Sequence, residues 1–173
     1  MKLYGIIGKT LRHSFSQKYF TKKFENESIP AAFNVFPLKE IAHVAVLCRI
    51  LPDLAGFSVT IPYKTEIIPY LTGLYPTARA IGAVNCVKVV RTGNEIELWG
   101  YNTDYVGFSE SLKPYLNPKI TSALVLGTGG ASKAIVFALE QLNIRAVLVS
   151  RNAERLTYDQ LTPEIIADNL LIV

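Results

Sequence analysis

The chain has 173 residues and a formal net charge of +4, with 50% hydrophobic and 18% charged residues. This composition is too apolar and too weakly charged for a disordered or collagen-like segment, and the length suits one large domain or two small ones. No apolar run approaches the roughly 20 residues of a membrane-spanning helix. The first residues do not form a secretory signal, so we expect a cytoplasmic protein with no membrane partner.

Charge and cysteine patterns exclude further classes. Lys and Arg form no block along the chain, so the basic balance favours small anionic ligands over nucleic acid. Cys48 and Cys86 stand far apart and outside any CxxC pattern, which predicts buried small side chains and no zinc site or disulfide framework.

Strand and helix patterns alternate in the first half of the chain. Short apolar runs bounded by Gly or Pro predict strands over residues 2–7, 33–36 and 56–61. Helical spacing predicts helices over residues 16–27 and 38–51. This order predicts an α/β fold with a mainly parallel, helix-covered sheet. Residues 83–90 and 95–99 flank a Gly-containing turn and predict a β-hairpin at the edge of that sheet.

A second α/β unit follows a helix predicted over residues 102–115. SALVLG, the helix that begins in GTGGAS and AVLVS form a βαβ pattern, and NLLIV at the end of the sequence predicts one more strand. We therefore expect a first domain over residues 1–103, a linking helix and boundary over 104–118, and a partial Rossmann-like domain over 119–173.

The glycine turn after the SALVL strand indicates a dinucleotide site. Gly127, Gly129 and Gly130 precede Ala131 at a strand-to-helix turn, where backbone N–H groups and the helix dipole favour a pyrophosphate. The GxGGAS spacing departs from GxGxxG, and such a turn by itself is as often only a turn. At the end of the next strand, Ser150 and Arg151, with Arg155 a turn later, replace the acid that reads the ribose of NAD, so charge favours NADP.

Polar residues gather after the predicted strands of the first domain, where open α/β sheets bind ligands. They are His13, Ser14, Ser16, Thr60, Lys64, Asn85, Asn102, Thr103 and Asp104. Hydroxyls, amides, an amine and a carboxylate suit a polyhydroxylated small molecule. Each residue also has a purely structural explanation, such as a helix cap for Ser16 or Asp104 or a turn for Asn85.

Six motifs stand in order along this chain: GKTLRHSFS, GFSVTIPYK, GAVN, GYNTD, LGTGGAS and SRNAER, which together span nearly all of it. They resemble, in the same order, the motifs of shikimate dehydrogenase. The resemblance implies a substrate-binding domain over residues 1–103 and an NADP-binding Rossmann domain over residues 119–173. The resemblance implies an oxidoreductase of aromatic amino acid (chorismate) biosynthesis that reversibly reduces 3-dehydroshikimate to shikimate with NADPH. It implies no metal, small-molecule partners, and a monomer or homodimer.

The resemblance also implies residue roles. Ser14 and Ser16 would bind the substrate carboxylate, while Thr60, Lys64, Asn85 and Asp104 would surround the ring hydroxyls. Lys64 and Asp104 would be the catalytic pair, because an ammonium can stabilise the charge that develops on a ketone oxygen and donate its proton.

Some positions depart from the family pattern. Gln17 replaces a Pro, Phe20 replaces a His, and Ser150-Arg151-Asn152 replaces Asn-Arg-Thr. The sequence also stops before the Asn-Thr-Thr and Gly-Met motifs of the nicotinamide pocket, so the C-terminal third of the family is missing and we expect little turnover from these residues alone. The alternatives are a quinate/shikimate dehydrogenase, a methylene-tetrahydrofolate dehydrogenase, or a non-catalytic module that binds shikimate or a nucleotide.

Overall fold

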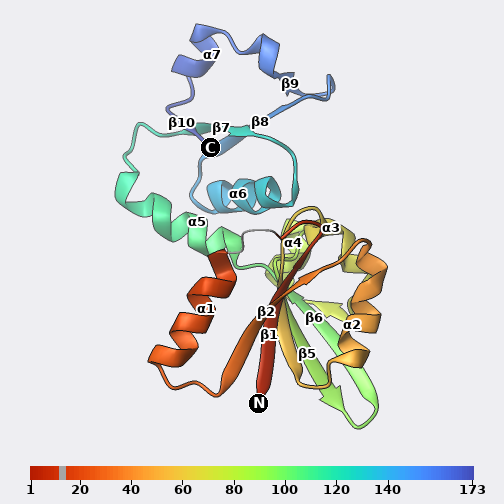
Figure 1. Cartoon of the computed structure of the whole chain (residues 1–173). Helices are drawn as coiled ribbons and strands as arrows, with labels where there is room; N and C mark the ends of the chain where they lie inside the picture. The colour runs from red at the N-terminus through yellow and green to blue at the C-terminus, as the bar shows by residue number, and fades with distance from the viewer. Residues whose placement is uncertain (12–14) are drawn as a thin grey trace. The chain divides into compact units, whose positions relative to one another are not determined.

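The computed structural model describes residues 1–11 and 15–173 (Figure 1). It divides into two compact units, Met1–Asn102 and Thr103–Val173. The helix that the sequence predicts as a link is grouped with the second unit. In the described part of the chain, no helix combines the length and the apolar character that crossing a bilayer requires.

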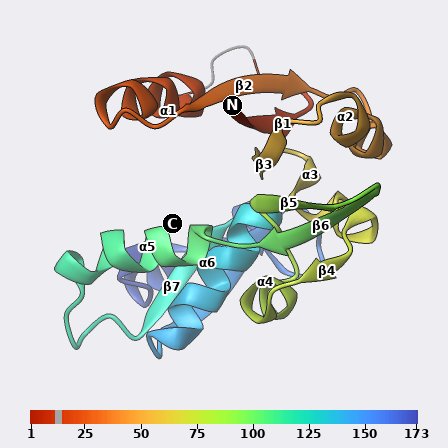
Figure 2. The ribbon, with the colours of Figure 1, turned by 90° about the horizontal axis from the view of Figure 1, so that it is seen from below.

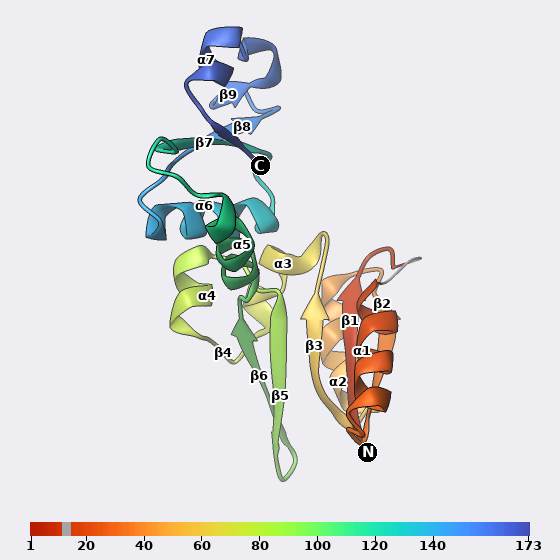
Figure 3. The same ribbon diagram turned by 90° about the vertical axis from the view of Figure 1, so that its left-hand side faces the viewer.

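The first unit is built on a six-stranded sheet of order β2-β1-β3-β5-β6-β4. In that order the strands are Ala31–Pro37, Lys2–Gly8, Leu54–Val59, Cys86–Thr92, Glu95–Tyr101 and Gly73–Leu74. The pairs β1–β2, β1–β3 and β4–β6 are parallel, whereas β5 is antiparallel to both β3 and β6. Figure 3 shows the consequence, with β1, β3 and β6 pointing toward one end of the sheet and β5 away from it. The prediction of a mainly parallel sheet is confirmed.

Helices cover both faces of this sheet. α1 (Phe15–Asn26) lies on one face, and α2 (Val44–Ile50) lies on the other (Figure 2). Shorter helical segments follow β3 and β4: α3 (Tyr63–Glu66), η2 (Ile68–Tyr70) and α4 (Pro76–Ile81). The main core lies on the α2 side, where Val44 and Cys48 pack with Ile7, Leu54 and Val59. Because apolar burial drives folding, this layer fixes the sheet on which the loops stand.

α1 is held differently, by aromatic rings. It buries none of its residues fully, but Phe20 stacks on Phe33 of β2 with ring centroids 4.8 Å apart. Phe24 lies 5.9 Å from Phe20 and 6.0 Å from Tyr4 of β1. The shared face predicted for Phe20 and Phe24 is therefore confirmed.

Three sequence-based boundaries differ from the structure. The helix predicted from residue 38 begins only at the 3-10 turn η1 (Ile41–His43), because the N–H of Leu38 continues the strand by donating to the carbonyl of Gly8 at 2.9 Å. The predicted hairpin begins at Cys86 and not at residue 83. It also does not form the sheet edge, since the two-residue strand β4 pairs beyond β6.

The second unit contains a four-stranded parallel sheet of order β10-β7-β8-β9. In that order the strands are Leu171–Ile172, Ser122–Leu126, Arg145–Ser150 and Leu156–Thr157. The helical segments are α5 (Asp104–Leu112), η3 (Lys113–Tyr115), α6 (Gly130–Gln141), η4 (Tyr158–Gln160) and α7 (Pro163–Ala167). Tyr105 of α5 meets Phe137 of α6 edge to face, with centroids 5.3 Å apart. The βαβ unit and the strand near Val173 are confirmed, whereas β9 and α7 had no clear sequence signal.

Candidate functional site

The polar loops of the first unit lie together where three of its strands end, and we call this the site edge of the sheet. β1, β3 and β6 end there, at Gly8, Val59 and Tyr101. The antiparallel β5 begins at the same edge, because Cys86 pairs with both Ser58 and Tyr101. Segments that are far apart in the sequence therefore start from neighbouring strand ends.

Loop 82–85 connects these segments through its backbone. Gly82, with φ of 67°, closes α4 in the left-handed conformation that glycine adopts without strain. The N–H of Val84 donates to the carbonyl of Lys64 at 2.7 Å. Asn85 joins two strand ends, since its carbonyl accepts from Val59 N–H at 2.8 Å and its N–H donates to Tyr101 at 3.0 Å. The positions of Lys64 and Asn85 are thus set by one loop.

The side chain of Asn102 also holds loop 82–85. Its side-chain Nδ2 donates to the carbonyl of Ala83 at 3.0 Å, and only 4% of the residue is exposed. The sequence analysis placed Asn102 in the GYNTD motif but gave it no role. A buried amide near a turn carries no sequence signal of its own, because the partner carbonyl is visible only in the fold.

Lys64 stands in α3, which is anchored by its neighbour Tyr63. The Tyr63 hydroxyl reaches the carbonyls of Leu38 at 2.8 Å and Lys39 at 2.9 Å, and the N–H of Tyr63 donates to Thr60. Burial, reinforced by the nearby carboxylates of Glu66 and Glu40, raises the pKa of this hydroxyl. The preceding Ile61–Pro62 peptide bond is cis. Lys64 itself is half-buried.

Thr60 lies against the end of β1. Its N–H donates to the carbonyl of Ile7 at 3.0 Å, and a Cβ placed on Gly8 would fall 2.7 Å from its Cγ2. Glycine at position 8 therefore allows this close approach. Ser16 is half-buried in the first turn of α1. Ser14 and His13 lie outside the described residues, so their predicted roles remain predictions.

Asp104 belongs to the second unit, where it opens α5. Thr103 is the N-cap and Asp104 is the first helical residue. A carboxylate in the first turn is favourable to the helix dipole, which is a sufficient structural reason for an acid at this position. The cap predicted for Asp104 is thus taken by Thr103. Its proposed pairing with Lys64 remains a prediction, as the two residues belong to different units.

The glycine turn joins β7 to α6. Gly127 has φ of 125°, which side-chain-bearing residues rarely adopt, and its N–H donates to Val149 at 2.8 Å. A Cβ placed on Gly129, the N-cap of α6, would meet nothing within 4 Å. Gly130 and Ala131 form the first turn of α6. The turn therefore offers helix-terminal N–H groups with open space in front of Gly129, as a bound phosphate requires.

A second turn follows β8, next to β7 in the same sheet. The buried Ser150 accepts a hydrogen bond from the N–H of Asn152 at 3.1 Å. Arg151 and Arg155 are both exposed. Glu154, which the sequence analysis overlooked, accepts from Asn152 Nδ2 at 3.1 Å, so one acid does stand in this turn.

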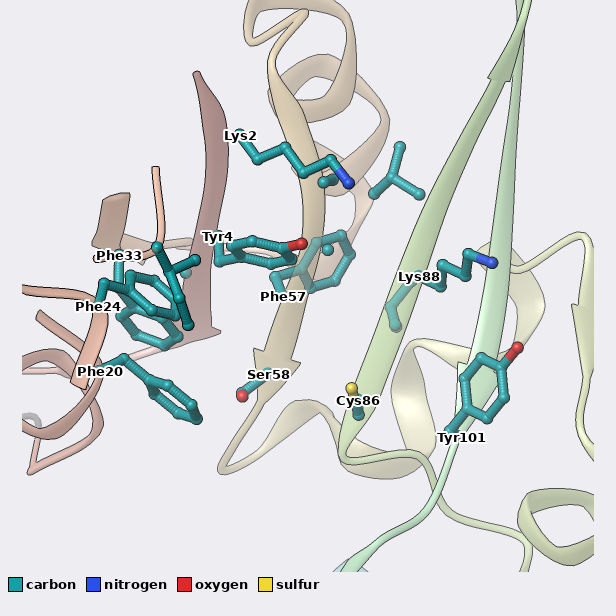
Figure 4. A pocket seen from close by; sticks show the side chains of 16 residues that line it. Lys2, Tyr4, Phe20, Phe24, Phe33, Phe57, Ser58, Cys86, Lys88 and Tyr101 are labelled. Atoms are coloured by element: carbon teal, nitrogen blue, oxygen red, sulfur yellow. The ribbon is translucent and has the colours of Figure 1, made fainter. Parts of the chain in front are cut away.

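A cavity of about 710 Å³ opens on the α1 face of the first sheet (Figure 4). Phe20, Phe24 and Phe33 form one side of it, and Tyr4 and Phe57 stand beside them. Thr60, Lys64 and Asn85 are not among its lining residues. Its lining does include Ser58, Cys86 and Tyr101, which are close in the sequence to Thr60, Asn85 and Asn102. Most of its lining is apolar, and its two charged residues, Lys2 and Lys88, are not among the polar residues that the sequence singled out.

Comparison with known proteins shows which families and structures this chain resembles. Residues 6–87 match the family model of the shikimate dehydrogenase substrate binding domain. A shikimate dehydrogenase (NADP(+)) of Clostridium botulinum is 39% identical over 154 residues, which cover 87% of this chain and 58% of that protein. The chain therefore spans a little over half the length of this curated relative.

Solved structures resemble the chain at the level of the fold. Shikimate dehydrogenase 1 from Peptoclostridium difficile is 33% identical with a TM-score of 0.79, over 91% of this chain and 59% of that one. Shikimate 5-dehydrogenase from Thermus thermophilus, solved in complex with NADP(H) and shikimate, is 28% identical with a TM-score of 0.77. The match covers 100% of this chain and 63% of the Thermus protein.

Proposed function

Residues 6–87 match the family model of the shikimate dehydrogenase substrate binding domain, and from that premise we propose that this chain binds shikimate and NADP(H). The proposed reaction is the reversible reduction of 3-dehydroshikimate to shikimate in aromatic amino acid (chorismate) biosynthesis. The observation that carries the proposal is loop 82–85, whose bonds to Lys64 and Tyr101 join three motif segments at one sheet edge.

The residues at that edge suit a polyhydroxylated acid. Thr60 and Asn85 each provide a donor and an acceptor for a ring hydroxyl. Ser16, with Ser14, would bind the substrate carboxylate through hydroxyl donors. A site built to pair hydroxyls rejects analogues that lack them, because its own polar groups are then left unsatisfied.

Lys64 would supply the proton in the direction of reduction. Negative charge develops on the carbonyl oxygen as the ketone becomes an alcohol, and an ammonium within hydrogen-bond reach stabilises that charge and then donates its proton. Asp104 would accept a hydrogen bond from the substrate hydroxyl and orient it. In the reverse direction, Lys64 as the free amine takes the hydroxyl proton.

The second unit contains residues that fit a dinucleotide. Gly127, Gly129, Gly130 and Ala131 would hold the pyrophosphate at the start of α6, where the positive φ and the open space are observed. Ser150, Arg151 and Arg155 would surround the ribose 2′-phosphate, since a guanidinium pairs with phosphate through two hydrogen bonds. Bound NADPH supplies the hydride that reduces the ketone.

Titration calorimetry of the chain with shikimate and with NADP tests this proposal, with turnover measured alongside. We expect both ligands to bind, and Lys64→Ala to abolish any shikimate oxidation. Lys22→Ala, an exposed lysine on α1, serves as the matched control and should change neither. Shikimate affinity and shikimate oxidation in Lys64→Ala that both equal those of the unmodified chain would overturn the role of Lys64.

Parallel titrations separate the alternatives. Preferential binding of quinate or of a methylene-tetrahydrofolate would move the assignment to those dehydrogenases. Tight shikimate binding by a polypeptide whose intact mass corresponds to 173 residues, without redox activity, would instead indicate a binding module.

A further inference from the structure

We propose that Asn102 is a positioning residue for the substrate site, acting through loop 82–85 on Lys64 and Asn85. The inference rests on the proposed function in one respect, the identity of shikimate as the ligand of the site. The contact itself is independent of that proposal, since it joins an amide and a carbonyl within the first unit.

The burial of both partners makes this hydrogen bond consequential. Asn102 is 4% exposed, and the Ala83 and Val84 side chains are fully buried. A buried carbonyl that loses its donor keeps the desolvation cost without the compensating bond. Loop 82–85 therefore has a strong preference for the conformation in which Ala83 faces the amide of Asn102.

Two successive residues at the end of β6 hold the loop. Tyr101 accepts from the N–H of Asn85, and Asn102 donates to the carbonyl of Ala83. Between these two points lies Val84, whose N–H donates to the carbonyl of Lys64. A shift of the loop at Ala83 would therefore move the donor on which the Lys64 backbone depends, and with it Asn85.

The chemistry at position 102 requires an amide donor. Aspartate has nearly the same shape, but its carboxylate would place a second acceptor opposite the Ala83 carbonyl. Serine keeps a polar group without the charge, and its hydroxyl is shorter than the amide arm. Asn102→Asp and Asn102→Ser thus remove the same bond in two ways, one of which adds no charge.

Asn169 provides a matched control in the second unit. It is also buried, at 5% exposed, and its Nδ2 donates to the carbonyl of Ile165 at 2.7 Å. Asn169→Asp makes the same chemical change at a site that shares no contact with loop 82–85. A general loss of stability should follow from either Asp variant, whereas a change in the substrate site should follow only from those at position 102.

The experiment combines shikimate and NADP titrations with amide hydrogen exchange of Val84 and Asn85. For both Asn102 variants we expect faster exchange at these two amides and shikimate affinity lowered about tenfold, as for one lost buried hydrogen bond. NADP affinity should stay within about twofold, and Asn169→Asp should change neither shikimate binding nor the exchange of these amides.

Two results would overturn the inference. One is unchanged exchange at Val84 and Asn85 in either folded Asn102 variant, and the other is an equal loss of shikimate affinity in Asn169→Asp. If the unmodified chain fails to bind shikimate, the proposed function fails, while the exchange rates still decide whether Asn102 holds the loop.

Discussion

The N–H of Val84 donates to the backbone carbonyl of Lys64 at 2.7 Å and so ties the segment after β3 to the loop before β5. Loops of open α/β sheets are mobile unless something outside the strands holds them. Here the bond lies within a framework that also includes Thr60 and Asn102. Backbone and amide contacts thus set the positions of Lys64 and Asn85, the residues that we propose bind the substrate.

Tyr63 is expected to anchor α3 through its hydroxyl. Tyr63→Phe keeps the ring and removes the donor to the Leu38 and Lys39 carbonyls. We therefore expect the free energy of unfolding, measured in urea, to fall by about 1 to 2 kcal/mol. Tyr70→Phe, at a tyrosine that is 41% exposed, should change stability little. Equal effects of the two substitutions would show that the hydroxyl does not anchor the turn.

Much of the first unit could be predicted from the sequence, for reasons that particular residues show. Gly8 marked the end of β1 because a turn residue closed an apolar run, and Phe20 and Phe24 showed a helix face by their spacing. Ala83 and Val84 misled the prediction, since their apolar side chains suggested a strand. They are buried because their loop is held by Lys64 and Asn102, a cause that only the tertiary structure reveals.

The edge strand and the role of Glu154 had no such signal. β4 contains only Gly73 and Leu74, too few residues for an alternating pattern, and it exists because β6 offers an open edge. Glu154 stands between the two arginines of the SRNAER motif, whose positive charge dominates that segment of the sequence. Its hydrogen bond to Asn152 depends on a turn whose geometry the motif alone does not specify.

Cys48 should make the fold sensitive to alkali. Burial in the α2 core raises the pKa of its thiol from 9.0 to about 11, with Arg91 partly opposing the change. The unfolded thiol thus ionises first as the pH rises. The contribution of this thiol to the free energy of unfolding is therefore fully present below pH 9 and is lost as the pH rises through 11.

We expect urea titrations at pH 9 and at pH 11 to show that the free energy of unfolding falls by about 2 kcal/mol over this range because of the Cys48 thiol. Cys48→Ala lowers stability at every pH through the cavity it leaves, but it should flatten this alkaline decline. Because the pKa of the buried Tyr63 hydroxyl is also raised, we expect the free energy of unfolding of Cys48→Ala still to fall somewhat above pH 10. An unchanged slope in Cys48→Ala would assign the whole decline to other groups.

Gly129→Ala should separate cofactor binding from stability. A Cβ there meets nothing within 4 Å and the φ of −76° is allowed for alanine, so we expect stability to change by less than about 0.5 kcal/mol. The added methyl group would occupy the space through which we propose that a pyrophosphate approaches, so NADP affinity should fall about tenfold in titration calorimetry.

Gly93→Ala is the contrasting control. Gly93 lies in the hairpin turn with φ of 59° and also has open space around it, so alanine there should lower stability through backbone strain and leave NADP affinity unchanged. Unaltered NADP binding by Gly129→Ala would remove the glycine turn from the proposed cofactor site.

Arg151 is expected to decide between the two nicotinamide cofactors. It follows β8 directly and is exposed, so its guanidinium can pair with a 2′-phosphate without a large desolvation cost. For Arg151→Ala we expect NADP affinity to fall about tenfold, in the range of a charge-assisted hydrogen bond. NAD affinity should be unchanged, because NAD has no 2′-phosphate.

Arg145→Ala, at the opposite end of the same strand, controls for the loss of one positive charge and should change the affinity for neither NADP nor NAD. Glu154 lies in the same turn, so Glu154→Gln should strengthen NADP binding slightly by removing a repelling carboxylate. A parallel loss of NADP and NAD affinity in Arg151→Ala would mean that the arginine contacts the shared part of the dinucleotide and does not read the phosphate.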